Sequence, residues 1–73
     1  MKFNEAIERV VKQARREHKK RGDNSMGSIH GGWALIHEEM EEAFEAIRAN
    51  DKKHLREEIT QVASTAIRFL AQI

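Results

Sequence analysis

The first third of the chain carries apolar residues at intervals of three and four, the spacing that places side chains on one face of an α-helix. Charged residues fill most of the positions opposite them. The pattern predicts an amphipathic helix over about residues 2 to 20. Its apolar stripe consists of Phe3, Ile7, Val10, Val11, Ala14 and His18. Because His18 lies on this stripe, we expect it to be a packed histidine.

Glycine, serine and asparagine cluster between residues 22 and 28, which indicates a loop. A second helix is predicted over residues 28 to 49 and a third over residues 52 to 72, separated by a short Asn50-Asp51 turn. Asp51 suits the N-cap of the third helix because its carboxylate can accept from the free amides of the next turn. The predicted fold class is therefore all-α, with one domain of three helices over residues 1–73.

The second predicted helix contains a carboxylate on its apolar side. The centre and one flank of the apolar face are formed by Ile36, Met40, Ala43, Ile47, Trp33 and Phe44. Glu39 lies within the other flank, and Glu42 lies at the edge one turn further on. An ionised carboxylate is costly to bury alone, so Glu39 needs a cation, a hydrogen-bond donor or access to water.

The third predicted helix repeats this arrangement after a shift of about 19 residues. Its apolar face consists of Leu55, Ile59, Val62, Ala66, Phe69, Leu70 and Ile73. Glu58 corresponds to Glu39, and Gln61 corresponds to Glu42. Two antiparallel helices would bring these four side chains toward one another, as a hard divalent cation requires. The alternative is that the acidic residues only keep a helical bundle in solution.

Composition limits the possible chemistry. The absence of cysteine excludes disulfides, thiolate zinc sites and a cysteine nucleophile. No apolar stretch has the length of a membrane span and the first residues are too charged for a signal peptide, so we expect a cytoplasmic protein with no membrane partner. With 40% hydrophobic residues in a chain of 73, one core is small, and we expect a homodimer or homotetramer.

Charge is distributed unevenly along the chain. Residues 1 to 22 hold eight Lys and Arg residues against three acidic residues, and residues 23 to 73 hold five against nine. The basic segment suits nucleic acid, nucleotide phosphates or an acidic helix of the same fold, and charge alone does not choose among them. One alternative is a helical adaptor or nucleic-acid-binding protein that uses Lys12, Arg15, Arg16, Lys19, Lys20 and Arg21. The acidic second helix and the lack of a DNA-binding motif argue against nucleic acid.

Two acidic motifs resemble a known family. The segment 38–42, Glu-Glu-Met-Glu-Glu, resembles the Glu-Glu-x-x-Glu signature of the MazG-like, all-α nucleoside triphosphate pyrophosphohydrolase superfamily. The segment 57–61, Glu-Glu-Ile-Thr-Gln, falls where that family has its second acidic motif. Over about residues 28 to 70 the chain is similar to small phage and bacterial MazG-like proteins. The expected architecture is a MazG-like helical bundle that oligomerisation completes.

The resemblance implies a Mg²⁺-dependent enzyme, with Mn²⁺ as the alternative cation, that cleaves a nucleoside or deoxynucleoside triphosphate into the monophosphate and pyrophosphate. By position, the metal ligands would be Glu39, Glu42, Glu58 and Gln61. Gln61 stands where the family has Asp, and a neutral amide contributes less charge to a metal site. A catalytically weak or inactive MazG-like protein that binds nucleotide or metal is therefore a second alternative.

The resemblance also suggests roles in catalysis and substrate binding. Glu38 would orient or deprotonate the attacking water, or would be a surface residue. Trp33 would stack on the base, although a lone Trp on an apolar helix face more often belongs to a core. The cations that would reach the β- and γ-phosphates are Lys19, Lys20 and Arg21. We favour the simpler explanation that these three residues offset the dipole at the end of their helix.

Overall fold

The computed structural model describes residues 1–73 and contains three α-helices and no strand. Helix α1 spans Phe3–Arg21, α2 spans Ile29–Arg48 and α3 spans Lys52–Gln72. The prediction of an all-α chain of three helices is confirmed, and each helix end lies within one residue of its predicted position. None of the three helices has both the length and the apolar character needed to cross a membrane.

Side-chain caps explain where α2 and α3 begin. The hydroxyl of Ser28 accepts a hydrogen bond of 2.9 Å from the backbone N–H of Gly31. The carboxylate of Asp51 accepts one of 3.0 Å from the backbone N–H of His54, which confirms the predicted N-cap. Helix α1 ends at Gly22, whose φ of 77° lies in the left-handed region that glycine adopts without strain.

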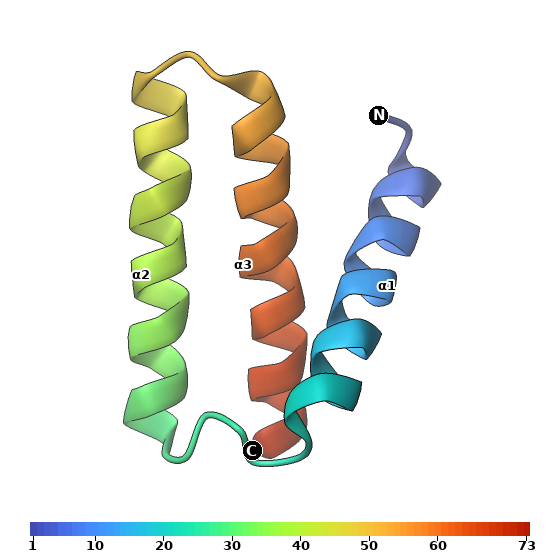
Figure 1. Cartoon of the computed structure of the whole chain (residues 1–73), viewed down its shortest axis with the longest axis vertical. Coiled ribbons are helices and arrows are strands. Elements are labelled where there is room, and N and C mark those ends of the chain that lie inside the picture. Colours follow the sequence, from blue (N-terminus) through green and yellow to red (C-terminus); the bar gives the residue numbers. More distant parts are fainter.

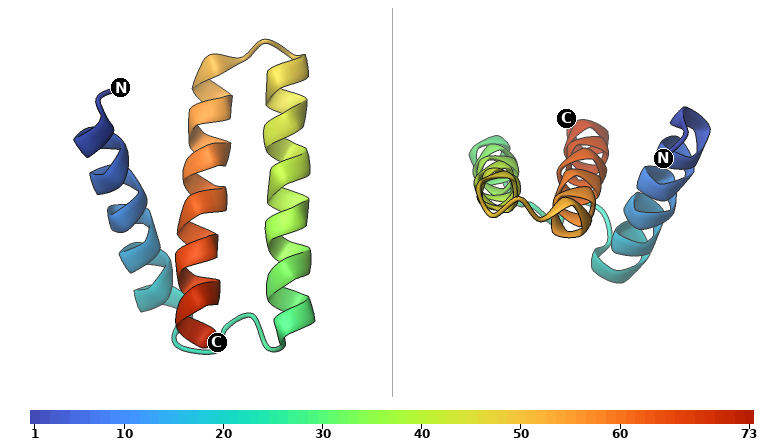
Figure 2. Two further views of the ribbon diagram at one scale, coloured as in Figure 1. Left: turned by 180° about the vertical axis from the view of Figure 1, so that it is seen from behind. Right: turned by 90° about the horizontal axis from the view of Figure 1, so that it is seen from above.

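Helix α3 lies between the other two helices, antiparallel to α2 (Figure 1). Seen along their axes, the helices form an open row and not a closed bundle (Figure 2). Helices α1 and α2 each pack against α3 and do not contact one another. The fold therefore has two separate interfaces, α2/α3 and α1/α3, which share α3.

The core of the single chain is made of small side chains. The buried residues are Ala14, Gly32, Glu39, Ala43, Ala46, Ser64 and Thr65. Small residues allow α2 and α3 to approach closely, and at Gly32 an added Cβ would lie 2.4 Å from ring atoms of Phe69. The α2/α3 interface is therefore a narrow strip with no room for larger side chains.

The expected apolar core is wrong in its details. On α2, Trp33, Met40, Phe44 and Ile47 are all more than half exposed, because α2 turns the neighbouring strip, with Glu39, toward α3. A row of three helices buries only the part of each outer helix that faces the middle one. Large apolar side chains of α1 and α3 are exposed for the same reason, namely Phe3, Ile7, Val11, Ile59, Ile67 and Leu70.

His18 is not packed as expected. Its side chain is 58% exposed, and Nε2 lies 3.4 Å from the carboxylate of Asp23 in the loop after α1. Helix α1 contributes only Ala14 to the buried set, because it meets α3 alone. The apolar stripe of α1 therefore extends beyond the surface that α3 can cover.

Candidate functional site

Glu39 is the one buried charged residue of the chain. Its side chain projects from the buried strip of α2, the residue is 7% exposed, and Oε1 has no hydrogen-bond partner. Desolvation raises the pKa of Glu39 above its usual value, while the nearby side chains of Thr65 and Gln61 oppose this rise. The hydroxyl oxygen of Thr65 is also buried without a partner. The interface therefore contains two polar atoms whose hydrogen-bonding capacity is unused.

Two further carboxylates, Glu42 and Glu58, lie about one helical turn away from Glu39. Glu42 of α2 and Glu58 of α3 line the same cavity of about 410 Å³, and the nearby Glu58 carboxyl raises the pKa of the Glu42 carboxyl. His54 lies one turn before Glu58 on α3, with Nε2 3.3 Å from Oε1 of Glu58. Two carboxylates this close favour sharing a proton or a cation.

Gln61 connects the buried carboxylate to α1. Its Oε1 accepts a hydrogen bond of 3.2 Å from Nε2 of Gln13, and its side chain lowers the pKa of Glu39. Gln13 also donates to Glu17, which accepts from Arg21 at 2.7 Å. A continuous chain of polar contacts thus runs along α1 and crosses to the α2/α3 interface. The side-chain oxygen of Gln61 is thus engaged by α1.

The four residues expected to bind metal therefore occupy one region but form two groups, Glu42 with Glu58 and Glu39 with Gln61. No three His, Asp or Glu side chains converge into a group that could hold a metal ion. The chemistry nevertheless suits a hard cation, because all the candidate donor atoms are oxygens and Oε1 of Glu39 lacks a partner. The residues fit Mg²⁺ or Mn²⁺ by donor type.

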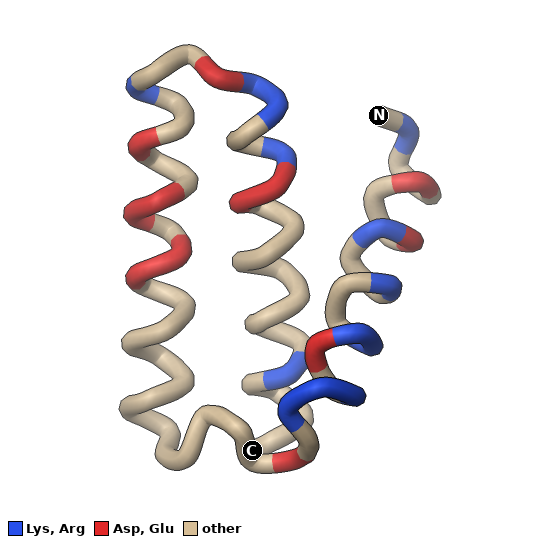
Figure 3. The backbone as a smooth tube through the Cα atoms, in the orientation of Figure 1, with Lys and Arg blue, Asp and Glu red and all other residues tan.

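No hydrogen bond or ion pair directly connects the remaining expected site residues to this region. Glu38 is exposed and forms no hydrogen bond or ion pair, and Trp33 is 61% exposed and not part of the core of this chain. The basic run 19–21 ends α1 near the C-terminus of the chain, whereas the glutamates of α2 and α3 lie toward the other end (Figure 3). Within that run, Arg21 is engaged by Glu17.

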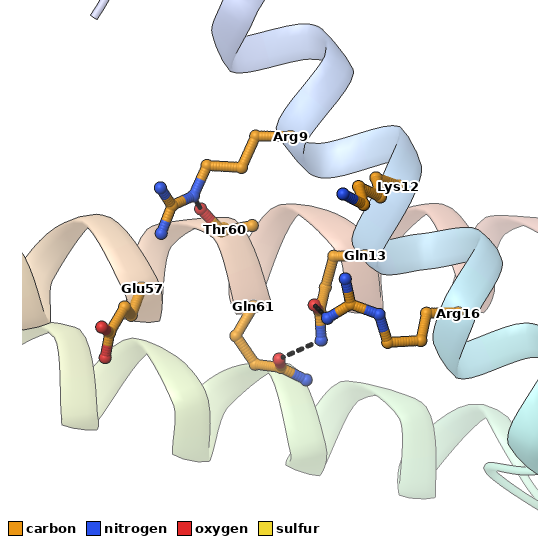
Figure 4. Close-up of a pocket in the computed structure, with 7 residues that line it drawn as sticks. All are labelled: Arg9, Lys12, Gln13, Arg16, Glu57, Thr60 and Gln61. Carbon is orange, nitrogen blue, oxygen red and sulfur yellow. Dashed lines mark hydrogen bonds between the residues drawn. The ribbon is translucent and has the colours of Figure 1, made fainter.

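The α1/α3 interface contains a feature that sequence reasoning missed. A pocket of about 390 Å³, called here the basic pocket, is lined by Arg9, Lys12, Gln13, Arg16, Glu57, Thr60 and Gln61 (Figure 4). The signal available in the sequence was the i, i+3, i+7 spacing of Arg9, Lys12 and Arg16, which places three cations on one helix face. Their convergence on Thr60 and Gln61 depended on how α1 docks, which the sequence pattern left open.

Comparison with known proteins adds no relative: no protein-family model, no curated protein and no solved structure matches the chain.

Proposed function

We propose that the protein is a divalent-cation-dependent hydrolase of nucleoside or deoxynucleoside triphosphates, of the MazG-like type, acting in the cytoplasm and releasing the monophosphate and pyrophosphate. The observation that carries the proposal is the cavity that Glu42 and Glu58 line together across the α2/α3 interface, one turn from the buried and unpartnered Glu39. This arrangement costs the free protein stability, because it holds carboxylates in a place where they repel one another and lose water. Binding of a cation would offset that cost.

The chain's own residues have distinct roles in this proposal. Glu42 and Glu58 would hold a divalent cation, and Glu39 would have to turn toward them to join it, because the three carboxylates do not converge in the free chain. Gln61 would act on the Glu39 carboxyl. Glu38, exposed on the same helix, would accept a proton from the attacking water. Water adds to the α-phosphorus, the bond from that phosphorus to the bridging oxygen breaks, and pyrophosphate leaves. A bound Mg²⁺ would neutralise charge on the phosphate oxygens.

The test is product analysis with a panel of nucleoside and deoxynucleoside triphosphates in Mg²⁺ or Mn²⁺. We expect monophosphate and pyrophosphate, with no products in EDTA. Glu58→Gln should lower kcat/KM by more than about 100-fold, because even residues that only support metal ligands are typically worth 10–100-fold. Glu41→Gln is the matched control, since Glu41 is an exposed glutamate of α2 whose only partner is His37.

Two further outcomes would decide between the alternatives. Turnover that persists in Glu58→Gln would contradict the proposed site. Absent turnover together with Mg²⁺-dependent nucleotide binding would indicate the catalytically inactive MazG-like protein. A second measurement reports on the cation without turnover: Mg²⁺ should raise the Tm of the wild type and leave the Tm of Glu58→Gln unchanged.

We also infer that the chain works as a homo-oligomer, a homodimer or homotetramer. One face of α2 exposes a line of large apolar side chains, Ile29, Trp33, Met40, Phe44 and Ile47. A continuous apolar stripe on a helix is the surface that a second copy of the same helix would bury. Pairing would give these residues the core that the single chain lacks.

Sedimentation analysis tests the assembly. We expect a dimer or tetramer at low micromolar concentration and a shift toward monomer in Phe44→Lys, which places a charge in the middle of the apolar stripe. Glu45→Lys is the control, because it introduces the same residue at the adjacent exposed position of α2. A folded wild-type monomer at that concentration would contradict the assembly.

A further inference from the structure

The three cations of the basic pocket are not neutralised by the fold. Arg9, Lys12 and Arg16 form no ion pair with any carboxylate of the chain. Arg9 donates only through Nε, to the hydroxyl of Thr60 at 2.9 Å, so its two terminal nitrogens have no protein acceptor. The ammonium of Lys12 donates no hydrogen bond, and Arg16 uses only one terminal nitrogen, at 3.1 Å from Oε1 of Gln13. The pocket thus retains several charged donors.

The lining of the basic pocket selects the kind of ligand. None of its seven residues is hydrophobic, whereas pockets that receive a base or another organic ring are mostly apolar. Its volume of about 390 Å³ is within the usual range for small-molecule sites. Glu57, the one carboxylate, lies at one end, and the side chain of Arg16 reaches to Gln13 beside Gln61 at the other (Figure 4). Three cations against one carboxylate favour a small polyanion.

The basic pocket adjoins the acidic region through a shared residue. Gln61 lines the pocket, is held there by Gln13, and also acts on the Glu39 carboxyl. Thr60 beside it is fixed by Arg9, while Glu58 on the same turn faces Glu42. A polyanion in the pocket would therefore lie next to Gln61, the residue that the pocket shares with the acidic region.

The geometry points to the basic pocket as the site for the terminal phosphates of the substrate, held by Lys12 and Arg16 and flanked by Arg9. As a substrate subsite this assignment rests on the proposed hydrolase function. These residues take the phosphate-binding role that the sequence analysis considered for Lys19, Lys20 and Arg21. None of those three residues lines the pocket, and Arg21 is already paired with Glu17. The ligand chemistry is an inorganic or nucleotide-borne chain of two or three phosphates.

The direct test is calorimetric titration with inorganic tripolyphosphate in EDTA, which requires neither turnover nor metal. We expect Lys12→Gln and Arg16→Gln each to weaken binding by about tenfold, the effect of losing one charge-assisted hydrogen bond. Arg15→Gln is the control, because it removes the same charge from the neighbouring position of α1, outside the basic pocket. Adenosine, which has no phosphate, should show no difference between the wild type and these variants.

Kinetic measurements distinguish the pocket assignment from the proposed hydrolase activity. If triphosphates are cleaved, Lys12→Gln and Arg16→Gln should raise KM, and tripolyphosphate should inhibit competitively. If no triphosphate is cleaved but tripolyphosphate binding still depends on Lys12 and Arg16, the pocket is supported and the hydrolase is not.

Three outcomes would overturn the pocket assignment. The first is that Arg15→Gln weakens tripolyphosphate binding as much as Lys12→Gln and Arg16→Gln do, which would mean that the general positive charge of α1, and not the pocket, binds the anion. The second is a raised KM only in Lys19→Gln or Lys20→Gln. The third is no tripolyphosphate binding together with salt-sensitive binding of duplex DNA, which would instead support the nucleic-acid alternative.

Discussion

The α2/α3 interface is lined by small residues around a buried carboxylate, whereas the α1/α3 interface has one buried alanine and is held by hydrogen bonds between polar side chains. Their electrostatics also differ. At the first interface the carboxyl pKa values of Glu39 and Glu42 are raised, and on α1 that of Glu17 is lowered by its hydrogen bond to Arg21. One middle helix thus separates a region that lacks positive charge from a region that has it in excess.

Because the two interfaces differ in charge, this small chain presents both carboxylates and positively charged side chains around one helix. Helix α3 presents Glu58 to the acidic side and Thr60 to the basic side, with Gln61 directed at both. The proposed substrate, a phosphate ester with its cation, needs carboxylates for the cation and positively charged side chains for the phosphates. An open row of helices supplies both, because neither side of α3 is closed off by a fourth helix of the same chain.

The largest expected effect comes from enlarging the small residues of the α2/α3 interface. Ala46→Leu should lower the free energy of unfolding by about 3 kcal/mol, the upper part of the usual cost of overpacking, because Ala46 is 3% exposed. Ala14→Leu at the α1/α3 interface should cost about 1 kcal/mol, since the polar contacts there can shift. Urea unfolding measures both, and Ala34→Leu, on the exposed side of α2, is the control. Equal losses at the two interfaces would remove the contrast between them.

The second effect concerns the buried carboxylate. Glu39→Gln should raise the free energy of unfolding at neutral pH by about 1 kcal/mol, because it removes a charge that the fold desolvates. The raised pKa means that the folded chain binds this proton more tightly than the unfolded chain. The stabilisation that protonated Glu39 gives the wild type is therefore fully present at pH values below its ordinary pKa of 4.5. It is lost as the pH rises through the raised pKa.

The pH dependence of the Glu39→Gln effect follows from the upward direction of the Glu39 pKa shift. The gain from Glu39→Gln should be absent near pH 4 and fully developed near pH 7, as followed by Tm at both values. A gain that is the same at both pH values would mean that the carboxylate is not desolvated. A loss at pH 7 would mean that Glu39 has a structural partner in the assembled protein.

How far the sequence predicted this structure differs between the two interfaces. Helix ends and the Asp51 cap depend on local chemistry, so apolar spacing and capping residues were enough to locate them. The shared phase of two helices joined by a tight turn predicted that the four residues of the acidic motifs approach one another, but not that Glu42 would lie with Glu58 and Glu39 with Gln61. The buried helix faces could not be predicted from the apolar pattern, because large apolar residues on α2 are as typical of a surface that binds another copy as of a core. Small buried residues such as Gly32 and Ala46 hardly contribute to that pattern. The basic pocket depended on the docking of α1, for which no local rule exists.

The smallest expected effect is at the ion pair of α1. Arg21→Gln should lower the free energy of unfolding by at most about 0.5 kcal/mol at pH 7, because the Arg21 side chain is 54% exposed and such pairs are weak. The lowered pKa of Glu17 gives the opposite sign to Glu39: its stabilisation is present above 4.5 and is lost as pH falls through the lowered pKa. The deficit of Arg21→Gln should therefore shrink in acid, while Arg15→Gln, whose side chain forms no ion pair, should show no such trend. Identical profiles for the two variants would mean that the general positive charge around Glu17, from Lys20 and Arg68, holds its pKa down without the direct bond.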